Sequence, residues 1–119
     1  MARILLAEDD DNMRLFLAGA LRRAGHSVEA TCDGAEAVGV LAKRSFDLLV
    51  ADVVMPGIDG VELARRASRD NPRLKVMFIT GFAAVALRGR SGVAGRARVL
   101  SKPFHLRDLV REVDHLLCS

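Results

Sequence analysis

Residues 47–52 read Asp-Leu-Leu-Val-Ala-Asp, and this stretch decides the fold. Its four central residues are all apolar, which is typical of a strand buried on both faces of a parallel sheet. The flanking Asp47 and Asp52 mark the two ends of this strand. The stretch therefore predicts a central strand whose carboxyl end carries an aspartate.

Four similar short runs lie on either side of this strand, and they predict the rest of the sheet. They occupy residues 4–7, 28–31, 76–79 and 97–100. The run at 28–31 is the weakest because Glu29 and Thr31 make it half polar. Helix-forming segments separate the runs, so strands and helices alternate along the chain.

The helical segments show apolar residues at a spacing of three and four. The first helix is expected to begin with Asp11 as its N-cap and to be closed by Gly25. The last helix begins at His105 and has the cleanest amphipathic pattern. The others are expected from about 37 to 44, from 61 to the Asn71-Pro72 pair, and as a short, frayed helix within 83–96. This alternation predicts an α/β, doubly wound parallel sheet with helices on both faces.

Length and composition predict one domain over residues 1–119, with no output domain. The chain has 50% hydrophobic and 28% charged residues, with a formal net charge of +3. No apolar run approaches the roughly 20 residues that cross a bilayer, so we expect a cytoplasmic protein with no membrane partner. Cys32 and Cys118 show neither metal-ligand spacing nor a disulfide framework.

Polar residues follow several of the predicted strands at the point where each strand ends. Parallel strands place their carboxyl ends at one edge of the sheet, where ligands bind in folds of this class. The residues expected to converge there are Glu8, Asp9, Asp52, Thr80 and Lys102.

Three clustered carboxylates repel one another unless a cation is present, and hard oxygen ligands favour Mg²⁺. Asp52 is the best candidate for a nucleophile that accepts a phosphoryl group, because it ends the most central strand. Glu8 and Asp9 are then left to hold the metal, while Lys102 neutralises charge and Thr80 donates a hydrogen bond. Each residue alone has a simpler explanation, such as a helix cap at Asp9 to Asp11. The joint pattern favours the functional explanation.

At these residues the chain resembles the bacterial response-regulator receiver domains over its entire length. The resemblance rests on residues 4–10, 47–52, 55–60, 79–81 and 102–104. It implies a flavodoxin-like, CheY-like sheet in the order 2-1-3-4-5. It also implies that Asp52 accepts a phosphoryl group from a histidine kinase or a histidine phosphotransfer protein.

The resemblance also implies the remaining roles in the site. Mg²⁺ would be bound by Glu8, Asp9, Asp52 and the backbone carbonyl of Val54. Thr80 and Lys102 would bind the phosphoryl oxygens, and the bond before Pro103 would often be cis. The protein would be a phosphoacceptor switch rather than an enzyme, with slow autodephosphorylation at most.

One position departs from the family pattern. Receivers commonly carry an aromatic residue three positions before the lysine, and Val99 stands there instead. Phe82 is close enough in sequence to Thr80 to replace it, or to pack in the core. With no output domain, we expect a downstream partner to contact a face that includes Phe82, Arg88, Arg90, Arg98, Val99 and His105. The alternative is that these residues form only a solvated basic surface.

A narrower resemblance lies in residues 75–87 and 99–110, which are similar to stand-alone receivers of alphaproteobacterial cell-cycle phosphorelays. This resemblance implies control of proteolysis by ClpXP, with the protease or its substrates as downstream partner and the unphosphorylated form active. A monomer is expected. The alternative within the family is a general phosphotransfer or chemotaxis-type receiver that is unrelated to proteolysis.

Three other kinds of protein fit the sequence less well. A Mg²⁺-dependent small-molecule phosphatase would need a second carboxylate two residues after its nucleophile, where Val54 stands. A flavin- or nucleotide-binding domain would need a phosphate-binding loop after the first strand, and the acidic residues 8–11 would repel phosphate. A nucleic-acid-binding protein is favoured only by the arginines, and the chain lacks Trp, Tyr and any recognition motif.

Overall fold

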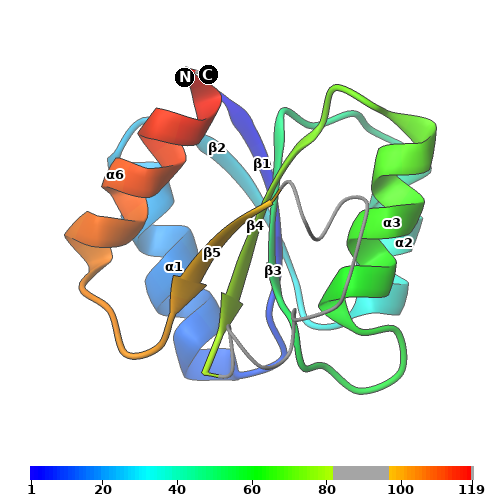
Figure 1. Ribbon diagram of the computed structural model, residues 1–119, viewed down its shortest axis with the longest axis horizontal. Helices are drawn as coiled ribbons and strands as arrows, with labels where there is room; N and C mark the ends of the chain where they lie inside the picture. The colour runs from blue at the N-terminus through cyan, green and yellow to red at the C-terminus, as the bar shows by residue number, and fades with distance from the viewer. Residues whose placement is uncertain (82–96, 119) are drawn as a thin grey trace.

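The computed structural model describes residues 1–81 and 97–118, and it contains a five-stranded parallel sheet (Figure 1). The strand order is β2-β1-β3-β4-β5. This order confirms the predicted doubly wound fold and the order 2-1-3-4-5. The strands are β1 (Arg3–Ala7), β2 (Ser27–Thr31), β3 (Leu48–Asp52), β4 (Lys75–Thr80) and β5 (Arg98–Ser101).

The third strand is central, as its uninterrupted apolar sequence predicts. All five residues of β3 are buried, because β1 and β4 flank it and helices cover both faces. The register pairs Ala7 of β1 with Ala51 of β3, so the residues that follow these strands leave the sheet side by side.

Four helices in the described residues cover the two faces of the sheet, as Figure 1 shows. Helices α1 (Asp11–Arg23) and α6 (Leu106–Leu117) lie on one face, and α2 (Gly34–Leu41) and α3 (Gly60–Asp70) lie on the other. Alternate residues of β1 point to opposite faces, so Ile4 packs in the core beneath α1 and α6 while Leu5 packs beneath α2 and α3. None of these helices is long and apolar enough to span a membrane.

Three helices begin with the same type of N-cap, an aspartate. Asp10, Asp33 and Asp59 are the N-caps of α1, α2 and α3, and each side chain accepts a backbone N–H in the first turn. The prediction of Asp11 as the first N-cap is therefore wrong by one residue. Among consecutive aspartates, the extended backbone of Asp10 decides the cap, because it lets Oδ1 reach the N–H of Met13 at 2.8 Å.

Several other boundaries differ slightly from the sequence expectation. Helix α1 ends at Arg23 with Ala24 as its C-cap, and Gly25 follows with a φ of 99°. Helix α2 ends at Leu41, earlier than predicted, and β5 lies one residue later. The helix predicted within 83–96 lies outside the described residues.

Candidate functional site

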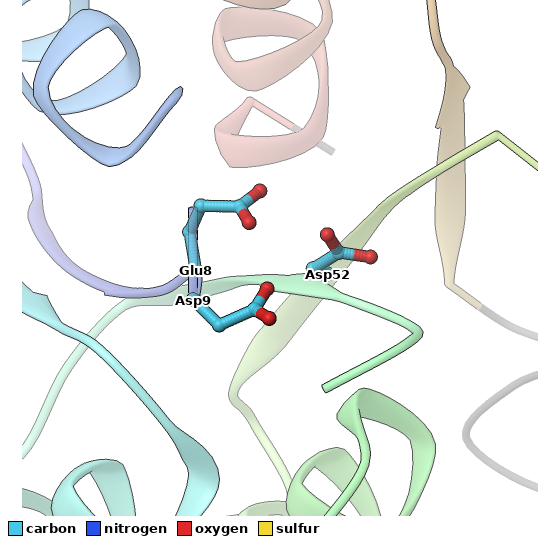
Figure 2. A group of neighbouring side chains, drawn as sticks. All are labelled: Glu8, Asp9 and Asp52. Carbon is cyan, nitrogen blue, oxygen red and sulfur yellow. The ribbon is translucent and has the colours of Figure 1, made fainter. Parts of the chain in front are cut away.

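Three carboxylates meet at the carboxyl ends of β1 and β3 (Figure 2). Glu8 and Asp9 follow β1 directly, and Asp52 is the last residue of β3. Each offers one oxygen atom, and these atoms lie within 4.8 Å of one another. The structure thus brings together the acidic residues that the sequence placed at this edge of the sheet.

Glu8 is almost completely buried. Only 1% of the residue is exposed, and its Oε2 accepts the N–H of Asp10 at 3.1 Å. Its other oxygen, Oε1, is buried without a hydrogen-bond partner. Burial raises the pKa of Glu8 to about 7, and repulsion from Asp52 contributes to the rise. A buried carboxylate oxygen of this kind needs a positive partner.

Lys102 supplies part of that positive charge from the other side of the site. Its Nζ donates a hydrogen bond to Asp52 Oδ2 at 3.0 Å and lies 3.6 Å from Glu8 Oε1. Partial burial lowers the pKa of Lys102, but the hydrogen bond to Asp52 and the charge of Glu8 outweigh it and leave the pKa raised. The bond between Lys102 and Pro103 is cis, as the family resemblance implied.

The second oxygen of Asp52 is bound by the loop that follows β3. Oδ1 accepts the N–H of Val54 at 3.1 Å, and the Val54 residue is 60% exposed at the surface. Thr80 is buried at the end of β4, and its carbonyl accepts the N–H of Lys102 at 2.9 Å. Of the residues predicted to bind a phosphoryl group, Thr80 therefore ends the strand next to β3, and Lys102 follows β5 and reaches Asp52 with its side chain.

The residues present fit a hard divalent cation. All three clustered ligands are carboxylate oxygens, which suit Mg²⁺ better than a softer metal. The buried Glu8 Oε1, which lacks a hydrogen-bond partner, is an independent sign that the site is built for a cation.

Three residues that support the site were missed by sequence reasoning. Arg14 donates from Nη1 to the carbonyl of Glu8 at 2.9 Å and from Nη2 to Asp11 Oδ1 at 2.6 Å. Asp10 holds the Glu8 carboxylate through its N–H, as described above. Gly60 packs so closely that a Cβ atom there would overlap the carbonyl oxygen of Asp52. The sequence signal for this last contact is a glycine after an N-cap aspartate, and an Asp-Gly pair is equally typical of a turn.

A pocket of about 550 Å³ opens beside Lys102. It is lined mainly by apolar side chains from the first turns of α1, from the loop after β5 and from the first residue of α6, namely Met13, Phe16, Pro103, Phe104 and Leu106. Phe16 is 62% exposed and its neighbour Leu15 is 71% exposed. This exposed apolar surface next to the carboxylates was not predicted from the sequence.

The predicted partner face is described only in part. Val99 is 37% exposed on β5, Arg98 lies 3.6 Å from Glu112, and His105 is the exposed residue before α6. Phe82, Arg88 and Arg90 lie outside the described residues, so their expected roles stay predictions.

Comparison with known proteins agrees with this geometry. A sequence model of the response regulator receiver domain matches residues 4–114. The chain is 57% identical to the response regulator receiver protein CpdR of Brucella abortus, with 100% of this chain and 99% of CpdR aligned. This similarity confirms the narrower resemblance found in residues 75–87 and 99–110.

Solved structures show the same fold. A CheY-like receiver domain protein from Methanospirillum hungatei superposes with a TM-score of 0.91 at 27% identity, over 99% of this chain and 94% of that one. The response regulator TrrA from Thermotoga maritima, solved in complex with Mg²⁺ and BeF, superposes with a TM-score of 0.83 at 27% identity over 98% and 99% of the two chains.

Proposed function

Since this chain belongs to the response regulator receiver family, we propose that it is a phosphorylation-controlled switch in which Asp52 accepts a phosphoryl group. The donor is the phosphohistidine of a histidine kinase or a histidine phosphotransfer protein. One observation carries the proposal: the Lys102 ammonium contacts Asp52 at 3.0 Å, at the place where Glu8 and Asp9 converge. A cation and an acidic cluster around one aspartate suit phosphoryl transfer.

The acidic cluster would hold Mg²⁺ through Glu8, Asp9 and Asp52, and the family resemblance adds the backbone carbonyl of Val54. When bound, Mg²⁺ neutralises negative charge on the phosphoryl oxygens, which lets an anionic donor approach an anionic acceptor. The supporting observation is the buried Glu8 Oε1, which lacks a hydrogen-bond partner among the described residues.

In the transfer itself, a carboxylate oxygen of Asp52 forms a bond to phosphorus while the P–N bond of the phosphohistidine breaks. The electron pair of that bond returns to the imidazole ring of the donor, which then takes up a proton from solvent. Asp52 is only 7% exposed, so the acyl phosphate would be partly protected from water.

Lys102 and Thr80 would communicate the modification to the rest of the molecule. The acyl phosphate carries about two negative charges where the carboxylate carried one, and the Lys102 ammonium already lies at that carboxylate. The main chain of Lys102 is bonded to the carbonyl of Thr80, so the ends of β4 and β5 are connected through this pair. A change in the position of Lys102 would thus bias the loops that follow both strands.

The apolar pocket beside Lys102 supports docking of the donor next to Asp52. Exposed apolar side chains that adjoin one another and an apolar pocket mark sites of protein contact, whereas single scattered ones do not. Leu15 and Phe16 therefore offer a surface on α1 on which the helix that carries the phosphohistidine can pack.

The resemblance to stand-alone receivers of cell-cycle phosphorelays, which the 57% identity to CpdR strengthens, favours a role in cell-cycle signalling with control of proteolysis by ClpXP as the output. The unphosphorylated form would promote degradation, and phosphorylation of Asp52 would switch it off. The contact surface would include Arg98, Val99 and His105, which lie on or next to β5 and α6. The proposal places the protein in the cytoplasm as a monomer.

The first test is the intact mass of the protein after incubation with Mg²⁺ and acetyl phosphate. Wild type is expected to gain the mass of one phosphoryl group, and Asp52→Ala is expected to gain none. Asp70→Asn is the matched control, because it removes an exposed carboxylate at the far end of α3. Labelling of Asp52→Ala, or labelling without Mg²⁺, would refute the assignment of the site.

The output is tested separately with purified ClpXP and immobilised protein. Unphosphorylated wild type and Asp52→Ala are both expected to retain the protease or a substrate of the protease. Acetyl phosphate with Mg²⁺ should release it from wild type only. If the immobilised protein retains the protease or its substrate equally in all states, control of proteolysis by phosphorylation is refuted.

A further inference from the structure

The apolar pocket of about 550 Å³ is connected to the acceptor site through Lys102. This residue lines the pocket, and its Nζ donates a hydrogen bond to Asp52 Oδ2 at 3.0 Å. Among the described residues that line the pocket, Lys102 is the only charged one, and none is a carboxylate. The pocket therefore adjoins Asp52 but differs in charge from the acidic cluster on the other side of it.

The lining of the pocket is partly fixed by the core. Met13, Phe104 and Leu106 are partly buried and pack against the core cluster between the sheet and helices α1 and α6. Phe16 forms the part of the lining that stands at the surface, with 62% of the residue exposed. A volume of about 550 Å³ is typical of pockets that bind small molecules.

The chemistry of phosphoryl transfer places a leaving group near Asp52. The attacking and leaving atoms lie roughly in line on opposite sides of phosphorus, so the leaving group is held away from the attacking oxygen. Toward β1, Glu8 and Asp9 present carboxylates, as Figure 2 shows, and these repel an anionic leaving group. The pocket presents no such charge in its described lining, so it can receive the leaving group of a donor.

The composition of the pocket distinguishes between classes of leaving group. A nucleotide or polyphosphate leaving group carries several negative charges and gains nothing from apolar side chains. The imidazole of a phosphohistidine has no hydrocarbon chain to bury. The carboxylate that leaves from an acyl phosphate carries a single charge, and its hydrocarbon chain gains free energy when an apolar lining removes it from water.

From these observations we propose that the pocket binds the acyl chain of small acyl phosphates and makes the protein selective for donors with longer chains. The inference rests on the proposed function of Asp52, and it names the class of small donor that the same site prefers. In the transfer, an oxygen of Asp52 bonds to phosphorus while the P–O bond to the acyl group breaks. The electron pair of that bond stays on the leaving carboxylate, so no proton moves.

The test compares acetyl, butyryl and hexanoyl phosphate as donors in the presence of Mg²⁺. Intact mass measured over time gives a second-order rate constant of labelling for each donor. The parent straight-chain acids have nearly equal acidity, so the three donors differ mainly in the apolar surface of the chain. A buried methylene is worth up to about fourfold, so we expect butyryl phosphate to exceed acetyl phosphate about tenfold.

Two variants of α1 locate the chain in the pocket. Phe16→Ser is expected to remove most of the preference for butyryl over acetyl phosphate, because it removes the exposed part of the lining. Leu15→Ser is the matched control, because Leu15 is 71% exposed and does not line the pocket. The ratio of the two rate constants is compared, since it does not depend on the folded fraction of a variant.

The outcomes separate this inference from the proposed switch. Equal rate constants for the three donors in wild type would overturn the inference and leave the switch intact. A preference that persists in Phe16→Ser, or that Leu15→Ser removes equally, would also overturn it, because the chain would then lie outside the pocket. Failure of acetyl phosphate itself to label wild type would overturn the switch and this inference together.

Discussion

Glu8 makes the stability of the metal-free protein depend on pH. Its pKa is raised from 4.5 in the unfolded chain to about 7 in the folded state, chiefly by burial. Between these values the folded state keeps a proton that the unfolded state has lost, so the free energy of unfolding falls as pH rises. Above pH 7 this loss in the free energy of unfolding reaches its full size, which is about 3 kcal/mol.

Glu8→Gln removes this ionisation and keeps the shape of the side chain. We expect the variant to gain stability over wild type as pH rises from 5 to 8 in the absence of Mg²⁺. Urea unfolding followed by circular dichroism measures the difference at each pH. A difference that is the same at both ends of this range would contradict the assignment of the raised pKa to Glu8.

Arg14 is expected to act on the metal through Glu8. Its guanidinium holds the Glu8 carbonyl at 2.9 Å and so fixes the start of the acidic loop. Groups that orient metal ligands typically contribute about tenfold or more to metal affinity. We therefore expect Arg14→Leu to weaken Mg²⁺ binding about tenfold in calorimetry, and Arg14→Lys to restore part of the loss.

Arg22 offers a matched control on the same helix. It donates to the carbonyl of Val28 at 2.9 Å, at the end of α1 that is remote from the carboxylates. Arg22→Leu should leave Mg²⁺ affinity unchanged. Equal losses in the two variants would mean that α1 as a whole, and not the bond to Glu8, determines the affinity.

The first turn of α3 presses against the end of β3, and Gly60 makes this possible. An added Cβ atom would overlap the Asp52 carbonyl oxygen and lie 2.8 Å from its carbonyl carbon. Main-chain atoms in a buried sheet cannot yield easily, so we expect Gly60→Ala to lower the free energy of unfolding by about 3 kcal/mol. It should also weaken Mg²⁺ binding, because Asp52 is displaced.

Gly39 provides the comparison within α2. An added Cβ there meets nothing within 4 Å, and the residue is exposed. Gly39→Ala should stabilise the protein by about 0.5–1 kcal/mol, since alanine favours the helix. Urea unfolding of both variants tests the pair, and a similar effect of the two alanines would exclude close packing at Gly60 as the cause.

The sequence predicts whole elements better than their ends. The apolar runs identify every described strand, and most clearly β1, β3 and β4, because strands buried on both faces tolerate few polar residues, whereas the edge strands β2 and β5 are partly exposed. Helix ends depend on one or two backbone angles, and the aspartates at 9–11 all suit an N-cap in composition. Only the folded backbone shows that Asp10 is the cap and that Gly60 begins a helix.

The site could be predicted as a set of residues but not as a set of contacts. The rule that parallel strands share one carboxyl edge suffices to bring Glu8, Asp9 and Asp52 together. It does not show that Lys102 reaches Asp52 across 50 residues of sequence, nor that Arg14 turns inward toward Glu8. Long side chains have many conformers, and packing selects among them.

For the whole molecule, metal binding should be visible as a gain in stability. The folded state gathers three carboxylates that the unfolded chain keeps apart, so Mg²⁺ binds the folded state preferentially. At a concentration one hundred times its Kd, a ligand of this kind adds about 2.7 kcal/mol. We expect the melting temperature to rise with Mg²⁺ and to return to its original value with a chelator.

Asp9→Asn should abolish this rise while leaving the metal-free protein folded, because Asp9 is exposed. An equal rise in Asp9→Asn and wild type would place the stabilising ion elsewhere. Calorimetric titration of the two proteins separates the alternatives.

The strand order also has a consequence for protein synthesis. The acceptor site combines the end of β1, the end of β3 and Lys102, which follows β5. Strands β1 and β3 are neighbours in the sheet although β2 lies between them in the sequence. A nascent chain therefore carries no complete site until Lys102 has left the ribosome, although Glu8 and Asp9 emerge more than 90 residues earlier. Incomplete translation products would not be phosphorylated. The cell's pool of phosphorylated protein would therefore contain only molecules in which all five strands of the sheet are present.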